Sequence, residues 1–194
     1  MTGSPAIPEA SAASALVFVG PMAAGKTSIG RRVARELGWE FHDTDARIVA
    51  GHGPITEIFA EHGEAHFRAL EEEAVRSALT GGAGRIVSLG GGAVLSSATR
   101  QLLRGFPVVL LTTTQEAVLS RTNLDKRPLL KDDPEAWGRI YAERLPLYRE
   151  VADQTWASER RPKEHIAAEI TAWFRANHAP AEPIHGEAKD EQHD

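Results

Sequence analysis

The stretch GPMAAGKT, Gly20 to Thr27, decides the fold, and it directly follows the apolar run ALVFV at residues 15–19. It matches the pattern G-x-x-x-x-G-K-[ST] in full, and the residues after it show helical apolar spacing. A strand, a glycine-rich loop and a helix in this order place backbone N–H groups and the positive end of the helix around an anion. The sequence therefore predicts a loop that binds the phosphates of a nucleotide; the alternative is a chance glycine-rich turn.

Each residue type in this loop has a task of its own. The Lys26 side chain reaches the β- and γ-phosphates, and the Thr27 hydroxyl is a ligand for Mg²⁺. Ala23 occupies a position that the pattern leaves free, and we expect its backbone to avoid the angles that favour glycine. The loop residues predicted to bind ATP are Met22, Ala23, Ala24, Gly25, Lys26, Thr27 and Ser28.

Composition limits the classes of protein that can carry this loop. The 194 residues, with 42% hydrophobic and 25% charged side chains, fit one domain with a sizeable core. The formal net charge of −5 argues against a nucleic-acid partner, and the absence of cysteine excludes disulfides, iron–sulfur clusters and thiolate catalysis. No apolar stretch approaches the roughly 20 residues that span a bilayer, and the N-terminus lacks the features of an export signal. We therefore expect a cytoplasmic enzyme without a membrane segment.

Apolar runs that alternate with helical patterns predict the architecture. Residues 1–13 and 178–194 lack apolar periodicity and are expected to be disordered tails around one domain at residues 14–177. The expected strands are residues 15–19, 39–42, 85–89, 108–111 and 154–158, and the apolar helical positions are Ile29, Val33 and Leu37, then Phe67, Leu70, Ala74 and Ala78, then Ile166, Ile170 and Phe174. Continuous apolar strands between helices indicate an α/β fold, a three-layer sandwich around a parallel sheet.

Two carboxylates follow the second expected strand in the segment DTD, Asp43 to Asp45. Ligands of open parallel sheets bind at the carboxyl ends of the strands, so this segment should face the phosphate loop. Asp43 would then hold Mg²⁺ through water, and Asp45 would accept a proton or a hydrogen bond from an acceptor hydroxyl. The alternative is an N-terminal cap of the next helix, formed by Asp43 or Thr44.

A carboxylate-binding arginine is predicted in the helical segment EAHFRALEEE, residues 64–73. Arg68 lies one helical turn from Glu64 and Glu71, so an acidic neighbour would hold its guanidinium in place for a bidentate contact. The alternative is an ordinary surface salt bridge. The run from Glu71 to Glu73 is expected to be mostly a solvated face.

Two loops complete the expected site. The segment SLGGGAVL places Gly90, Gly91 and Gly92 at a strand end, where backbone N–H groups can approach a ligand; a merely flexible loop is the alternative. The polar segment at residues 122–133 is expected to be a lid whose Arg127 swings over the γ-phosphate, unless Arg127 is an ordinary surface arginine.

Three further arginines are candidates, although each residue of this kind is more often at the surface than in a site. Arg144 lies close to an expected helix end at Pro146. Arg160 and Arg161 lie just before a helix whose first turn holds Pro162.

Two other patterns are rejected. His62 and His66 have a spacing that zinc ligands use, but Gly63 follows His62, so the pattern H-E-x-x-H fails and no third ligand is evident. The segment NLDK at residues 123–126 has its residues in the wrong order for a guanine-specificity motif.

These residues together resemble the shikimate kinase family over about residues 15–175. The blocks that carry the resemblance are GPMAAGKTSIGRR, GWEFHDTD, ITEIFAEHGEAHFR, SLGGGAVL, RPLL and RLPLY, in the family's order. The resemblance implies a P-loop kinase fold similar to nucleoside-monophosphate kinases, with five parallel strands in the order 2-3-1-4-5. It also implies Mg²⁺- and ATP-dependent phosphorylation of the 3-hydroxyl of shikimate, on the route to chorismate and the aromatic amino acids, by a monomer.

The resemblance further implies roles for single residues. Asp45 would bind the shikimate hydroxyls and act as the base, with Lys26 and Arg127 as the other catalytic residues. The implied shikimate-binding residues are Asp45, Phe67, Arg68, Gly90, Gly91, Gly92 and Arg144, with residues 44–80 as the main substrate-binding segment. The implied ATP-binding residues outside the phosphate loop are Arg121, Arg127, Arg160 and Arg161, and the implied metal-binding residues are Thr27 and Asp43.

Two departures from the family pattern, and three rival functions, are part of the prediction. Ala23 stands where many members have glycine, which bears on ATP affinity, and the segment from Arg121 to Arg127 is slightly shortened. The rivals are a kinase of another small metabolite, similar to gluconate kinases, a phosphate-loop switch ATPase without an acceptor, and an inactive binding relative. We expect direct in-line transfer without a covalent intermediate, because no nucleophile constellation is evident.

Overall fold

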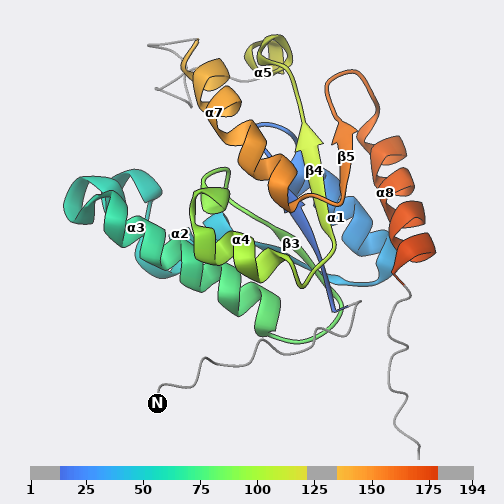
Figure 1. Ribbon diagram of the computed structural model, residues 1–194, viewed down its shortest axis with the longest axis horizontal. Coiled ribbons are helices and arrows are strands. Elements are labelled where there is room, and N and C mark those ends of the chain that lie inside the picture. The colour runs from blue at the N-terminus through green and yellow to red at the C-terminus, as the bar shows by residue number, and fades with distance from the viewer. Residues whose placement is uncertain (1–13, 122–134, 179–194) are drawn as a thin grey trace, which may run out of the picture.

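A five-stranded parallel sheet forms the centre of the protein in the computed structural model, which describes residues 14–121 and 135–178 (Figure 1). The strands are β1 (Ala15–Val19), β2 (Glu40–Asp43), β3 (Arg85–Ser88), β4 (Val108–Thr112) and β5 (Gln154–Ala157). Their order in the sheet is β2-β3-β1-β4-β5, and every neighbouring pair is parallel. The predicted fold, the strand order and all five strands are confirmed, each strand end to within one residue.

Helices cover both faces of the sheet. They are α1 (Lys26–Leu37), α2 (Thr44–His52), α3 (Ile55–Thr80), α4 (Ser97–Leu103), α5 (Gln115–Arg121), α7 (Ala136–Val151) and α8 (Lys163–Asn177), with a 3₁₀ helix η1 at Ala93–Leu95. The helices α1 and α8 pack on one face, and α3, α4 and α7 pack on the other (Figure 1). None of the helices in the described ranges has the length and apolar character needed to cross a membrane.

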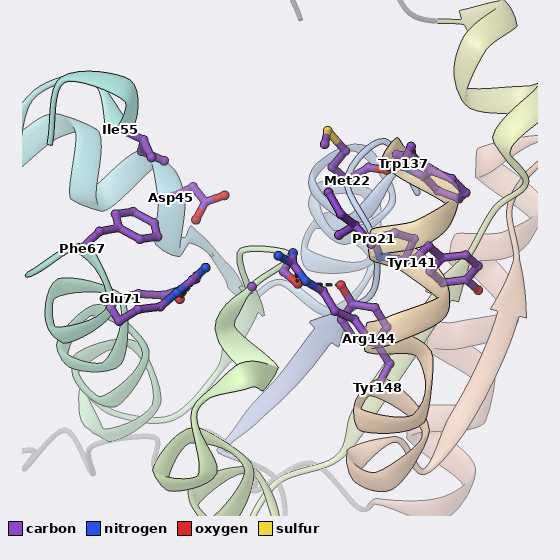
Figure 2. A pocket seen from close by; sticks show the side chains of 14 residues that line it. Pro21, Met22, Asp45, Ile55, Phe67, Glu71, Trp137, Tyr141, Arg144 and Tyr148 are labelled. Carbon is purple, nitrogen blue, oxygen red and sulfur yellow. Dashed lines mark hydrogen bonds and ion pairs between the residues drawn. The ribbon is translucent and has the colours of Figure 1, made fainter. Parts of the chain in front are cut away.

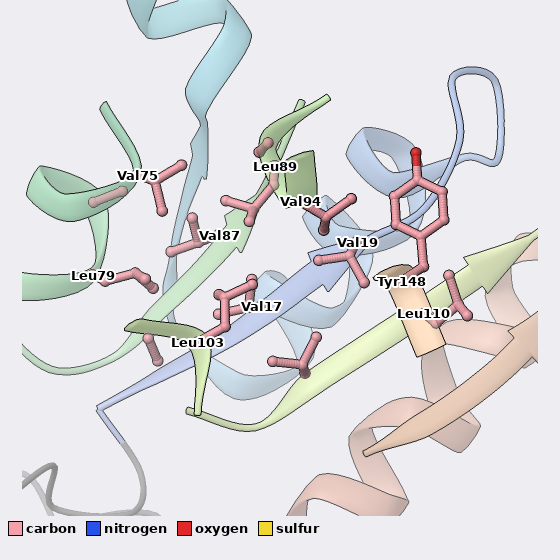
Figure 3. Close-up of a cluster of buried hydrophobic side chains, with 14 residues drawn as sticks. Val17, Val19, Val75, Leu79, Val87, Leu89, Val94, Leu103, Leu110 and Tyr148 are labelled. Carbon is pink, nitrogen blue, oxygen red and sulfur yellow. The ribbon is translucent and has the colours of Figure 1, made fainter. Parts of the chain in front are cut away.

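Strand β1 shows how the three layers are joined, because all of its side chains are buried. Leu16 and Phe18 pack with α1 and α8, whereas Val17 and Val19 pack with the opposite helix layer (Figure 3). A continuous apolar run is what a strand covered on both faces requires. Each large side chain buried in this way contributes about 1.5–3 kcal/mol, so the two clusters fix the sheet and the loops at its edge.

The loops after β1, β2 and β3 lie side by side at the carboxyl edge of the sheet. The register pairs Ser88 at the end of β3 with Phe18 of β1 on one side and with Asp43 of β2 on the other. Helix α1 begins directly after Gly25, which has a φ of 88°. Helix α2 begins directly after Asp43. The sheet therefore brings the phosphate loop, the DTD segment and the triple glycine to one place.

The structure differs from the sequence predictions at two prolines, Pro146 and Pro162. Helix α7 runs through Pro146 to Val151, so the predicted helix end at Pro146 is wrong. A proline inside a helix costs about 3 kcal/mol, but the turn that follows it carries Tyr148, which is 1% exposed in the core and stabilises the continued helix. Pro162 lies one residue before α8 rather than in its first turn.

Candidate functional site

Two neighbouring cavities open at the carboxyl edge of the sheet. The first, the phosphate-loop chamber, measures about 330 Å³ and is lined by Met22, Ala23, Gly25, Lys26, Thr27, Ser28, Asp43, Asp45, Ser88, Leu89 and Gly91. The second, the arginine chamber, measures about 370 Å³ and is lined by Pro21, Met22, Asp45, Ile55, Phe67, Arg68, Glu71, Gly91, Gly92, Trp137, Ile140, Tyr141, Arg144 and Tyr148. Met22, Asp45 and Gly91 line both chambers and so form the boundary between them.

The lysine of the phosphate loop holds the loop in shape. Lys26 Nζ donates hydrogen bonds to the carbonyl oxygens of Gly20, at 2.7 Å, and Pro21, at 2.8 Å. Gly20 must be glycine, because a Cβ there would overlap the carbonyl oxygen of Leu111 in the neighbouring strand. The loop is therefore fixed against the sheet at its start and closed by its own cation.

Ala23 has a φ of 66° and is, within the described residues, the one residue other than glycine with a positive φ. The expectation that this position avoids the angles that favour glycine is wrong. The left-handed region costs an L-residue roughly 1–2 kcal/mol, so contacts around the loop must hold the conformation. One such contact is adjacent: Trp137 Nε1 donates to the Met22 carbonyl oxygen at 3.2 Å, in the peptide group just before Ala23.

Thr27 and Asp43 contact each other beside the loop. Thr27 Oγ1 donates to Asp43 Oδ2 at 2.7 Å, while Asp43 Oδ1 accepts the N–H of Ala46 at 3.2 Å. Asp43 therefore caps α2, as the alternative interpretation has it, and also lines the phosphate-loop chamber; its role in holding Mg²⁺ stays a prediction. A hydroxyl and a carboxylate so close to a phosphate cradle suit Mg²⁺, which proteins often hold through one or two carboxylates together with substrate phosphates.

Asp45 lies half-buried in the first turn of α2, on the boundary of the two chambers. Burial raises the pKa of its carboxyl group above the usual value and the negative charge of Asp43 raises it further, while Lys26 and Arg68 lower it. Asp45 Oδ1 lies against Gly90 so closely that a Cβ on Gly90 would overlap it. A carboxylate at this point faces both chambers and binds protons more readily than one in water.

Gly90 supports this carboxylate from behind. Its N–H donates to Thr44 Oγ1 at 3.1 Å, so the structure places this N–H on a protein acceptor instead of directing it at a ligand. Gly91 and Gly92 line the arginine chamber, as expected of the triple glycine. The three glycines of the segment therefore have two different tasks.

Arg68 is held by two carboxylates of its own helix. Its Nη1 donates to Glu71 Oε2 at 2.6 Å, and its Nε and Nη2 donate to Glu64 Oε1 at 3.2 and 3.1 Å. The guanidinium lies 5.3 Å from the centre of the Phe67 ring, and a Cβ on Gly92 would overlap its Nη1. The predicted ion pair is confirmed: Arg68 and Glu71 line the arginine chamber, whereas Glu64 is exposed.

Glu71 is 3% exposed, so the expectation that it belongs to a solvated face is wrong. Burial raises the pKa of its carboxyl group, and the hydrogen bond from Arg68 lowers it. The run of three glutamates looks solvated in the sequence, but the first of them turns inward because Arg68 offers it a charged partner inside the chamber.

Arg144 approaches the same chamber from α7. Its Nη1 donates to the carbonyl oxygen of Gly91 at 3.2 Å, and its Nε is buried without a hydrogen-bond partner in the described ranges. The Tyr148 hydroxyl donates to the same carbonyl at 2.6 Å, and burial raises the pKa of this phenol to about 12. Figure 2 shows the two sides of the chamber, with Asp45, Phe67 and Glu71 facing Trp137, Arg144 and Tyr148.

The remaining predicted site residues lie elsewhere or cannot be placed. Arg161 donates to Glu169 Oε2 at 3.0 Å in front of α8, Arg160 is exposed, and neither lines either chamber. Arg127 and the expected lid at residues 122–133 lie outside the described residues, as does the side chain of Arg121, the last residue of α5.

The rejected histidine pair is also visible. The rings of His62 and His66 lie 4.9 Å apart on an exposed face of α3. No cluster of three or more His, Cys, Asp or Glu side chains that could hold a metal occurs in residues 14–121 and 135–178.

Trp137 and Tyr148 are among the residues of the arginine chamber that sequence reasoning missed, and Glu71, predicted as a partner of Arg68, was not expected to line it. For Glu71 a signal existed, because it stands one turn from an arginine that was already a candidate. Tyr148 belongs to the RLPLY block and follows Arg144 by one helical turn. For Trp137 no signal existed, since nothing in its neighbourhood marks an isolated tryptophan as part of a site.

Comparison with known proteins gives concordant matches along most of the chain. The family model described as shikimate kinase matches residues 22–175. A protein of Salinispora arenicola (strain CNS-205) named shikimate kinase is 44% identical over 163 residues, which cover 82% of this chain and 97% of that protein. One of Streptomyces coelicolor with the same name is 44% identical over 154 residues, covering 78% and 90%. Among solved structures, shikimate kinase from Acinetobacter baumannii in complex with shikimate superposes with a TM-score of 0.78 at 37% identity, covering 85% of this chain and 94% of that one.

Proposed function

The chain belongs to the shikimate kinase family, and from this we propose how its two chambers divide the reaction. The activity is the ATP-dependent phosphorylation of shikimate on its 3-hydroxyl, which gives shikimate 3-phosphate and ADP on the route to chorismate. The phosphate-loop chamber takes ATP and the arginine chamber takes shikimate. The observation that carries this division is the shared boundary, where Asp45 faces both cavities.

On the nucleotide side, the loop presents a helix N-terminus and a cation to the phosphates. Lys26, which bonds two loop carbonyls in this structure, would turn to the β- and γ-phosphates. Thr27 and Asp43 would hold Mg²⁺. When bound, Mg²⁺ offsets the negative charge of the phosphates. Arg127, the predicted lid arginine, would contact the γ-phosphate, and Arg121, Arg160 and Arg161 stay predictions for the adenine side.

On the acceptor side, a rigid ring carboxylate fits between two arginines. Arg68 and Arg144 come from opposite sides of the chamber, and both line it. Phe67 offers its ring as an apolar wall, and the backbone of Gly91 and Gly92 closes the floor. The hydroxyls of shikimate would then lie toward Asp45, the one carboxylate on the boundary with the phosphate loop.

The chemistry needs positioning and charge neutralisation more than a nucleophile on the protein. The 3-hydroxyl oxygen forms a bond to the γ-phosphorus while the bond to the β,γ-bridging oxygen breaks, and ADP leaves. Asp45 accepts the hydroxyl proton, and its raised pKa makes it a stronger base than an ordinary aspartate. Lys26 stays near the oxygens on which negative charge accumulates.

The experiment that tests this function is the release of ADP with and without shikimate. We expect release with Mg²⁺ and shikimate, far less with gluconate, and little without an acceptor. Equal release without any acceptor would identify a phosphate-loop ATPase, and a preference for gluconate would identify a kinase of another metabolite. Either result contradicts the proposal.

Assembly and location also stay predictions. We propose a monomeric, cytoplasmic enzyme that consists of one kinase domain with no nucleic-acid or membrane partner. Light scattering after size-exclusion chromatography, with and without both substrates, measures the mass in solution. A dimer under both conditions contradicts the monomer.

A further inference from the structure

One hydrogen bond connects the far side of the arginine chamber to the phosphate loop. The indole Nε1–H of Trp137 donates to the Met22 carbonyl oxygen at 3.2 Å, across 115 positions of the chain. Trp137 lines the arginine chamber only, whereas Met22 lines both chambers, and the two lie next to each other in Figure 2. The bond therefore runs from helix α7 to the loop that forms the neighbouring chamber.

The indole is held in a fixed position. Trp137 is 3% exposed, packs on the Tyr141 ring with 5.0 Å between ring centres, and shares an apolar cluster with Val118 of α5. Helices α5 and α7 are in close contact beside Trp137, because a Cβ on Gly138 of α7 would overlap Oε1 of Gln115 in α5. The N–H group is thus presented to the loop from a rigid support.

The direction of the Met22 carbonyl sets the direction of the Ala23 N–H, because both belong to one peptide group. No peptide bond in residues 14–121 and 135–178 is cis, and in a trans peptide group the C=O and N–H point in opposite directions. A Met22 carbonyl that points at Trp137 therefore directs the Ala23 N–H to the other side, and Ala23 lines the phosphate-loop chamber. No backbone acceptor in the described ranges takes this N–H.

Ala23 needs a restraint of this kind. Its φ of 66° lies in the region that favours glycine, and an alanine there is strained. An alanine released from restraint would return to negative φ, and that change would rotate the N–H away from its present direction. The hydrogen bond at Met22 acts on the peptide group that this rotation would move.

We propose that Trp137 is a positioning residue for ATP: its indole N–H holds the Met22–Ala23 peptide group so that the Ala23 N–H is presented to the nucleotide phosphates. The inference rests on the proposed function, because it takes the phosphate loop as the ATP site. It adds Trp137, a residue of the arginine chamber, to the residues that determine nucleotide affinity.

The test measures ADP affinity by calorimetry in the presence of Mg²⁺, without shikimate. Trp137→Phe keeps an aromatic ring and removes the donor, and we expect the Kd for ADP to rise roughly 3- to 10-fold, as for the loss of one neutral hydrogen bond. In kinetics, the KM for ATP should rise more than the KM for shikimate. Trp39→Phe is the matched control, since Trp39 packs against Phe174 in the α1–α8 layer, away from both chambers. It should bind ADP as the unchanged protein does.

A rescue separates positioning from packing. Glycine adopts a positive φ without strain, so Ala23→Gly should restore most of the ADP affinity that Trp137→Phe loses. An equal loss in both backgrounds, or an unchanged Kd in Trp137→Phe, overturns the proposal. If Trp137→Phe does not fold, 3-benzothienylalanine at position 137 keeps the fused ring without the N–H, and the same outcomes apply. If the unchanged protein neither binds ADP nor phosphorylates shikimate, the proposed function fails instead.

Discussion

The two arginines that meet in the arginine chamber are held in opposite ways. Arg68, on the α3 side, is bonded to Glu64 and Glu71 before any ligand arrives. Arg144, on the α7 side, donates to the Gly91 carbonyl and keeps a buried Nε that has no partner in the described part of the chain. One side of the chamber is electrostatically complete, and the other retains an unused donor.

The difference shows which contacts serve stability and which serve binding. A buried donor without a partner costs about 1–3 kcal/mol, so the free Nε of Arg144 is a cost to folding that a bound carboxylate can offset. Arg68 instead stabilises the fold, because its guanidinium is the hydrogen-bonded cation beside the buried carboxylate of Glu71. Loss of either arginine should weaken shikimate binding, but only one loss should weaken the fold.

The largest expected effect tests whether the base lies on the α2–α3 side. Asp45→Asn should lower kcat roughly 10²- to 10⁴-fold, the usual contribution of a general base. Tyr148, one of two tyrosines of α7 that line the opposite side, has its pKa raised to about 12 by burial and stays protonated at neutral pH. Tyr148→Phe should therefore lower kcat far less. The measurement is ADP release at saturating ATP and shikimate.

Two further measurements make the result specific to Asp45. The Kd for ADP should change little in Asp45→Asn, because the phosphate loop is intact. Glu73→Gln, which removes an exposed carboxylate of α3, should leave kcat unchanged. Turnover of Asp45→Asn within tenfold of the unchanged protein would remove Asp45 from its role as base.

The second prediction compares the two arginines directly. Arg68→Met and Arg144→Met should each raise the KM for shikimate roughly 10- to 100-fold, as for the loss of a charged hydrogen bond. Their melting temperatures should move in opposite directions. Arg68→Met leaves Glu71 buried without its cation, whereas Arg144→Met removes an unpaired donor and leaves the Gly91 carbonyl bonded to Tyr148. Since 1 kcal/mol corresponds to about 2–4 °C for a chain of this size, the difference is measurable by calorimetry.

Arg76→Gln is the control for both variants. Arg76 pairs with Glu73 on the exposed face of α3, so its loss should change neither the KM nor the melting temperature by a measurable amount. If Arg68→Met and Arg144→Met are destabilised equally, the contrast between a complete and an incomplete side of the chamber is wrong.

The third prediction concerns the pKa of Asp45. Arg68 is one of the groups that lower this pKa, and Arg144 is not among them, so Arg68→Met should raise it further and Arg144→Met should leave it in place. Carboxyl-carbon NMR titration without shikimate measures the shift, with Asp45→Asn to identify the signal. Equal pKa values of Asp45 in both variants contradict the assignment.

The titration of Asp45 also makes the free energy of unfolding depend on pH, in a direction that follows from its raised pKa. The pKa of Asp45 is raised in the folded state, so the stability that its protonated form contributes is complete below the unfolded pKa of about 4. That stability is lost as the pH rises through the folded value. The free energy of unfolding should therefore fall more between pH 4 and pH 7 in Arg68→Met than in Arg144→Met.

Those parts of the site that depend on one local segment could be predicted from the sequence. The apolar runs give the central strands β1, β3 and β4 because these are largely buried, whereas the edge strands β2 and β5 are exposed or partly buried and have a weaker apolar pattern. The sheet order then places the phosphate loop, Asp43 and Asp45 together. The pair of Arg68 with Glu64 and Glu71 follows from helical spacing alone. In each case the cause lies within a few residues of the effect.

The parts that failed depend on partners far along the chain. The burial of Glu71 is set by the chamber that α3 and α7 enclose, and no local pattern separates it from Glu73. The continuation of α7 through Pro146 depends on the core around Tyr148. The positive φ of Ala23 is a property of the whole loop, and Trp137, its neighbour in space, stands 115 positions from Met22.

The smallest expected effect concerns Ala23→Gly in the otherwise unchanged protein. Glycine removes the strain of a positive φ, worth roughly 1 kcal/mol, but it also gains conformational freedom in the unfolded chain, which costs about 0.4–1 kcal/mol. The two terms nearly cancel in stability. The affinity should also change little, for a different reason: α7 already holds the Met22 carbonyl through Trp137 in the free protein, so the loop has its conformation before the nucleotide binds. We therefore expect the Kd for ATP to stay within about threefold, measured by titration with the non-hydrolysable analogue AMP-PNP. A much tighter Kd in Ala23→Gly would mean that the loop is not held before the nucleotide binds, and that the α7 side contributes nothing to the phosphate-loop chamber.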